Sequence, residues 1–227
     1  MLGHLAALAQ SHTTLEESNM GDVNLRFEAI PVFAPLIALF LAFLALRAAR
    51  GKAGPRWDWK YVPVRMLTAI YIAGVLGFTF FPFQIMYGKY ADHMVWYNQV
   101  NWLPLVTLDS SAIPNVILTV PLGMALPILS GKVTSARRAL ALGAAFSLAI
   151  EVAQVLGCVL FNNYRGADVN DVIVNALGCM LGYWIVRQAS KVSFLKDLLQ
   201  RLALPGSVLA TGVQSLGAVT HSQVQPR

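Results

Sequence analysis

Five long apolar segments constrain this chain more than any other feature of its sequence. A helix rises about 1.5 Å per residue, so about 20 apolar residues cross a hydrocarbon core of ~30 Å. Segments of roughly that length cover residues 30–46, 64–83, 113–129, 138–161 and 169–187. Only 12% of the residues are charged, about half of what a soluble domain carries. The sequence therefore predicts an all-α protein, a polytopic membrane helical bundle with about five transmembrane helices.

The basic residues predict the orientation of this bundle. Of 17 Lys and Arg residues, six fall in the connection of spans one and two or at its edges, three in the connection of spans three and four or at its edge, and five from the last residue of span five onward. The opposite side keeps Arg26, Lys89 and Arg165. Since an excess of Lys and Arg marks cytoplasmic loops, we expect the N-terminus outside and the C-terminus inside. The same asymmetry explains the net charge of +6, so we predict no nucleic-acid partner.

The segments outside the spans have their own signatures. Residues 1–29 are polar and mildly acidic and lack the pattern of a signal peptide, so we expect an extracytoplasmic head that the mature chain retains. Residues 189–204 alternate apolar and basic residues at helical spacing, which is typical of a cytoplasmic amphipathic helix on the membrane surface. Residues 205–227 have no periodicity and are expected to be disordered. Residues 101–105 are too short to span and are expected at the interface.

Polar side chains gather in the last two spans. Glu151 and Gln154 share one helical face of span four, and Asp171 and Asn175 share a face of span five. A carboxylate inside a span is costly, which makes Glu151 a functional-site hypothesis. Gly178 begins a Gly-x-x-x-Gly motif that ends at Gly182 and predicts close approach to a neighbouring helix.

Counting depth along the helices places these groups in one pocket in the outer half of the membrane. The candidate ligand-binding residues are Asn101, Asn115, Glu151, Gln154, Arg165, Asp168, Asp171 and Asn175. Glu151 and Asp171 are also the candidate catalytic residues. We predict no metal site, although Asp168 and Asp171 are the residues that could form one, and we name no cofactor.

Structural roles stay open for several of these residues. Gln154 and Asn175 could serve only as interhelical hydrogen bonds, which are worth ~0.6 kcal/mol each. Asp168 is expected to cap the start of span five. Arg165 could pair with Asp168, or it could hold a phosphate-bearing lipid head group, with or without a divalent ion.

The ordered set of these motifs resembles the VanZ-like family. The matching pieces are Asn101-x-x-Pro104, Asn115 through Pro121-Leu122-Gly123, Ser147-x-x-x-Glu151-x-x-Gln154, and Arg165-x-x-Asp168-x-x-Asp171-x-x-x-Asn175-x-x-Gly178. The resemblance covers roughly Tyr61 to Arg187. It implies a small multi-pass protein of the bacterial cytoplasmic (inner) membrane, in a family whose namesake is linked to low-level resistance to the glycopeptide antibiotic teicoplanin. It implies no reaction.

Three functions stay open at this point. Standard hydrolase, phosphate-loop and Cys-x-x-Cys motifs are absent from the sequence. We favour a cell-envelope protein that binds an outer-leaflet amphiphile, such as a lipid-linked precursor or a lipoglycopeptide, and contributes to glycopeptide resistance or envelope maintenance. One alternative is a membrane-embedded enzyme acting on a phosphate-bearing lipid, with Glu151 as general base. The other is a small transporter or proton relay. Membrane lipids are the expected partners, and a homo-oligomer is left open.

Overall fold

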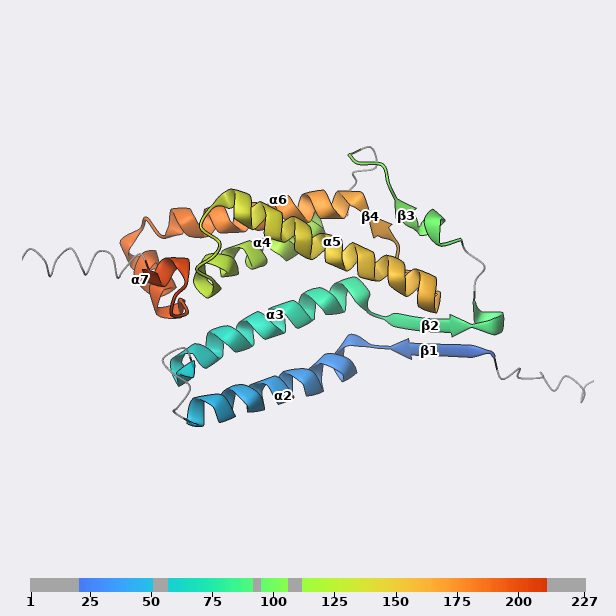
Figure 1. The fold of residues 1–227 in the computed structure, drawn as a ribbon, viewed down its shortest axis with the longest axis horizontal. Helices are drawn as coiled ribbons and strands as arrows, with labels where there is room; N and C mark the ends of the chain where they lie inside the picture. The colour runs from blue at the N-terminus through green and yellow to red at the C-terminus, as the bar shows by residue number, and fades with distance from the viewer. Residues whose placement is uncertain (1–20, 51–56, 92–94, 106–111, 212–227) are drawn as a thin grey trace, which may run out of the picture.

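The computed structural model describes residues 21–50, 57–91, 95–105 and 112–211. Five of its helices are long and apolar enough to cross a membrane (Figure 1). They are α2 (Ala29–Ala49), α3 (Val62–Phe80), α4 (Ala112–Leu129), α5 (Ala136–Phe161) and α6 (Val169–Ala189). The prediction of an all-α bundle with five spans is confirmed, and the chain is a multi-pass membrane protein.

The spans form two groups that lie side by side (Figure 1). One is an antiparallel hairpin of α2 and α3, and the other is a three-helix group of α4, α5 and α6. Within the three-helix group, α6 packs along both α4 and α5 and is the most buried span. The hairpin contacts this group much less extensively.

Small residues allow α4 and α6 to approach closely. A Cβ atom added to Gly182 would overlap the Val120 carbonyl oxygen, and one added to Gly178 would overlap the Thr119 hydroxyl. From the other side, a Cβ on Gly123 would overlap the Cys179 carbonyl oxygen. The close approach expected from the Gly-x-x-x-Gly motif is therefore confirmed, and the neighbour is α4.

Four short strands lie at one end of the bundle, which we call the strand end (Figure 1). β1 (Val23–Phe27) pairs antiparallel with β2 (Phe83–Tyr87), and β3 (Val100–Asn101) pairs parallel with β4 (Ala167–Asp168). α3 ends at Phe80, three residues before the expected end of its span. The reason is local, because Phe81 is extended, as the ring of a following proline requires.

The opposite end, which we call the basic end, carries α7 (Ser193–Leu202) and most of the basic residues (Figure 1). Among the described residues, the Lys and Arg residues of the strand end are Arg26, Lys89 and Arg165. The two ends of the bundle thus differ in charge as the loops predict, while the orientation itself stays a prediction.

Residues 203–211 continue from α7 along the ends of α4 and α6. The Leu204 N–H donates to the Ile128 carbonyl at 2.9 Å, and Leu209 is buried against Val186. Disorder is expected from residue 205 onward, whereas residues 205–211 pack against the bundle. The remainder of that segment, residues 212–227, and residues 1–20 of the expected head lie outside the described residues.

Candidate functional site

The site is built around Glu151, which lies on α5 ten residues before the helix ends. Its side chain is only 7% exposed, and its Oε2 accepts a hydrogen bond of 2.8 Å from the backbone N–H of Asp168. The chain reverses between these two residues. Asn162 takes the left-handed conformation and caps α5, as residues at helix C-termini commonly do, and the following turn brings the start of α6 beside Glu151.

Asp168 joins three segments at the strand end. It is the N-cap of α6, and its Oδ1 accepts from the Asn170 N–H at 2.7 Å, so the predicted capping role is confirmed. Its Oδ2 accepts from the Asn101 side chain at 3.0 Å. The pairing of β3 with β4 places Asn101 directly opposite Asp168, so backbone and side-chain bonds align the same two residues.

Asn170 is a site residue that the sequence reasoning missed. It is buried, its Oδ1 accepts from the Leu105 N–H at 2.6 Å, and its Nδ2 donates to the Leu103 carbonyl at 3.4 Å. Residues 101–105, which were expected at the membrane interface, therefore lie across the start of α6. The sequence does contain a signal for Asn170, because it is a third polar residue, between Asp168 and Asp171, at the start of a membrane span.

Asn175 lies one turn deeper and pairs with Ser147. Its Nδ2 donates to the Ser147 Oγ at 2.8 Å, and that hydroxyl donates to the Asp171 carbonyl at 3.3 Å. Ser147 is fully buried and Asn175 is 6% exposed. The Oδ1 of Asn175 is buried without a hydrogen-bond partner. A lone buried acceptor costs about 1–3 kcal/mol, so this position is energetically unfavourable.

A cavity of about 290 Å³ lies beside Glu151. Glu151, Asp168 and Asn101 are among its lining residues, but its surface is almost entirely apolar, and side chains of α5 that include Leu148, Val152 and Leu156 form much of its wall. About half of the surface of each of these three apolar side chains is exposed on the outside of the bundle. The cavity therefore opens on the surface that faces the membrane and lies beside a buried carboxylate.

Comparison with known proteins identifies the family. A family model described as VanZ/LLP1 matches residues 68–193, which is more than half of the chain and includes every candidate residue. The chain belongs to the VanZ/LLP1 family. The expected resemblance is thus confirmed. No curated protein and no solved structure showed a match to the chain.

In this VanZ/LLP1 protein, two further candidate residues, Gln154 and Arg165, form hydrogen bonds with the end of α3 rather than with the groups around Glu151. The Gln154 side chain donates to the Thr79 carbonyl at 3.1 Å, and the Arg165 guanidinium donates to the Phe81 carbonyl. Both acceptors lie at the C-terminal end of α3, where helix carbonyls lack partners within the helix. Gln154 and Arg165 therefore form hydrogen bonds between the hairpin and the three-helix group. Among the described residues, no ion pair joins Arg165 to Asp168.

The remaining candidates are less closely joined to the cluster. Asn115 lies half-buried near the start of α4, and none of the hydrogen bonds described above includes its side chain. Asp171 contributes its backbone carbonyl to Ser147. Over residues 21–50, 57–91, 95–105 and 112–211, no group of three or more His, Cys, Asp or Glu side chains gathers to form a metal site.

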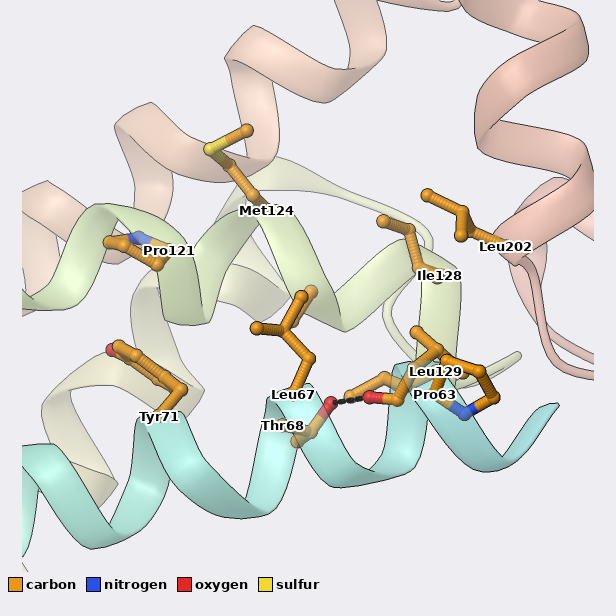
Figure 2. Close-up of a pocket in the computed structure, with 11 residues that line it drawn as sticks. Pro63, Leu67, Thr68, Tyr71, Pro121, Met124, Ile128, Leu129 and Leu202 are labelled. Carbon is orange, nitrogen blue, oxygen red and sulfur yellow. Dashed lines mark hydrogen bonds between the residues drawn. The ribbon is translucent and has the colours of Figure 1, made fainter.

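The hairpin and the three-helix group also leave space between them at the basic end. Figure 2 shows an apolar cavity of about 380 Å³ between α3, α4 and α7. Leu67 and Tyr71 of α3 and Pro121 and Ile128 of α4 line it, and Leu202 of α7 lies at one side. The Tyr71 hydroxyl donates to the Leu118 carbonyl at 2.6 Å. In this VanZ/LLP1 protein a few side-chain to backbone hydrogen bonds, rather than continuous packing, therefore join the two groups of spans.

Proposed function

We propose that this VanZ/LLP1 protein binds an amphiphile from the membrane in the cavity beside Glu151. The main support for this proposal is the cavity. It lies beside the buried Glu151 carboxylate, has an apolar wall, and is open at the surface of α5. The polar part of the ligand would lie at Glu151, Asp168 and Asn101, and its chain would follow Leu148 and Val152. Ligand sites of this kind combine apolar walls with a few well-placed polar groups.

The charges at the site define the chemistry of the ligand. Glu151 and Asp168 present carboxylate oxygens, which accept hydrogen bonds, so the ligand should offer donors such as amine, amide or hydroxyl groups. A phosphate placed next to two carboxylates would be repelled. A lipoglycopeptide has such donors on the part that carries its apolar chain. A lipid-linked precursor has them on its sugar and peptide, and its phosphates would have to lie away from the two carboxylates.

The biological role follows from the family and from the expected orientation. With the strand end outside, as the basic residues predict, the cavity lies in the outer leaflet of the bacterial cytoplasmic membrane. Capture of an envelope precursor or of a lipoglycopeptide there would contribute to envelope maintenance or to resistance against glycopeptides such as teicoplanin.

Native mass spectrometry of the protein extracted in mild detergent tests this proposal. We expect the wild type to retain a discrete amphiphile with amine, amide or hydroxyl donors, and Glu151→Gln to lose most of it. The Gln side chain keeps an acceptor for the Asp168 N–H, so the variant should insert and fold normally. Leu142→Ala, on α5 outside the cavity, is the matched control and should retain the ligand. Equal retention by Glu151→Gln and the wild type would contradict the proposal.

A further inference from the structure

A second groove lies on the other flank of the bundle, between α2 and α3. Its volume is about 630 Å³, and its walls are apolar except for Arg165. Phe33 and Ile37 of α2 face Gly74 and Phe78 of α3 across it. From Ile70 to Phe81 the groove follows about eleven residues of chain, or ~16 Å at the rise of a helix, from mid-membrane to the strand end.

This groove is open to the hydrocarbon of the membrane. Ile30, Ile70 and Phe78 line it and are at the same time largely exposed on the outside of the bundle. Small residues line part of it, including Ala34, Ala73 and Gly74, and leave the space that larger side chains would fill. In a membrane, the acyl chains of lipids contact such a surface.

Arg165 gives the groove a chemical preference. Its guanidinium has five N–H donors, and the structure records one acceptor for them, the Phe81 carbonyl. Among the described residues, no carboxylate forms an ion pair with Arg165. The acids of the neighbouring β1 region are already paired, since Glu28 binds Arg26 at 2.8 Å and Asp22 lies 3.8 Å from the Lys89 ammonium group.

A half-buried guanidinium beside an apolar groove favours binding of an anion. An unpaired charge next to hydrocarbon is costly, and the planar fork of Arg matches a phosphate with two parallel hydrogen bonds. A phospholipid supplies both parts, with a phosphate at the strand end and a chain that extends toward mid-membrane.

We infer that the groove between α2 and α3 binds an anionic phospholipid, with its phosphate at Arg165 and an acyl chain against Gly74 and Phe78. This site is distinct from the cavity at Glu151, which offers acceptors and therefore selects donors. Arg165 comes from the turn before α6, whereas the groove walls belong to the hairpin. The bound lipid would therefore link the hairpin to the three-helix group, where direct packing is sparse.

Gly74 offers a way to block the groove without disturbing the fold. A Cβ atom at Gly74 would have no neighbour within 4 Å, whereas one at Gly77 would lie 3.2 Å from the Ala29 Cβ. Gly74→Leu should therefore place its side chain in the groove without a clash. Leu is also a better helix former than Gly, so α3 should be retained.

The test is native mass spectrometry of the full chain, titrated with phosphatidylglycerol, with zwitterionic phosphatidylcholine of the same chains, and with inorganic phosphate. We expect the wild type to bind phosphatidylglycerol in preference to phosphatidylcholine. Arg165→Gln should weaken phosphatidylglycerol binding about ten-fold or more, as the loss of a charge-assisted contact predicts. Arg165→Lys, which keeps the charge, should retain part of the preference. Arg26→Gln removes an exposed cation at the same end and should bind as the wild type does.

Gly74→Leu separates lipid binding from a purely structural role of Arg165, because it leaves the Phe81 hydrogen bond in place. It should weaken binding of both lipids. Normal phosphatidylglycerol binding by Arg165→Gln or by Gly74→Leu would overturn the inference. Displacement of phosphatidylglycerol by inorganic phosphate at equal concentration would also overturn it, since it would show an anion site to which the groove adds nothing.

Discussion

The Oε2 of Glu151 accepts a hydrogen bond of 2.8 Å from the backbone N–H of Asp168, so a carboxylate inside one span fixes the position where the next span begins. Asp168 in turn caps α6 and holds Asn101 of β3. The same carboxylate lines the cavity that opens toward the membrane. One side chain thus contributes to the fold of the helix pair and to the proposed ligand site, and substitutions can separate the two roles.

Replacing Glu151 by Leu should destabilise the protein, whereas Gln should be tolerated. Leu has a similar size but leaves the Asp168 N–H without its acceptor, which costs about 1–3 kcal/mol in the free energy of unfolding. Gln retains a side-chain oxygen at the same place. Thermal unfolding of the purified variants in detergent measures the difference, and equal losses for Leu and Gln would show that the hydrogen bond is unimportant.

The contact between α4 and α6 predicts opposite outcomes at two glycines. Gly182→Leu would force a side chain into the Val120 carbonyl, and overpacking of this kind costs about 1–3 kcal/mol. Gly74→Leu meets open space and should be neutral or stabilising. Midpoints of thermal unfolding should separate the two variants, and an unchanged midpoint for Gly182→Leu would refute the close packing of α4 against α6.

Gln154→Leu should have a smaller effect than Glu151→Leu. Gln154 contributes one hydrogen bond, to the Thr79 carbonyl at the end of α3, and such interhelical bonds are worth ~0.6 kcal/mol on average. Its loss should mainly loosen the hairpin. Hydrogen exchange would detect this as faster exchange in residues 76–81 with little change in α6, and a uniform change across both groups of spans would argue against it.

The expected orientation can be tested with single cysteines at the two ends. Lys89 lies at the strand end and Lys196 at the basic end, so Lys89→Cys should react with a membrane-impermeant maleimide in intact cells. Lys196→Cys should react only after permeabilisation. Cys158 and Cys179 are buried, and the wild type provides the background signal. The reverse labelling pattern would move the Glu151 cavity to the inner leaflet.

The sequence predicts the spans well because length and apolar composition determine which segments cross a membrane. It also predicts the cap at Asp168 and the close approach at Gly178 and Gly182, since both depend on local spacing. It does not predict which helix Gly178 and Gly182 contact. In the structure that helix is α4, where Gly123 is the small residue that allows the close approach from the other side. That pairing depends on the order in which the helices pack.

The candidate site was predicted as one pocket, and the structure divides its members between two directions. Glu151, Asp168 and Asn101 come together, but Gln154 and Arg165 turn toward carbonyls of Thr79 and Phe81. Depth along a helix gives the level of a side chain but not the partner it meets. The pairing of β1 with β2 likewise joins segments far apart in sequence, which no local pattern in the two strands indicates.

Photo-crosslinking from Val152 tests the central claim most directly. Val152 lines the cavity beside Glu151 and is half-exposed toward the membrane, whereas Leu142 lies on α5 outside the cavity with similar exposure. A photoreactive residue at Val152 should capture one discrete amphiphile in the cell, and capture should fall sharply when Glu151→Gln is added. The same residue at Leu142 should capture only bulk lipid. If both positions yield the same mixture of bulk lipids, and Glu151→Gln changes nothing, the cavity is not a ligand site.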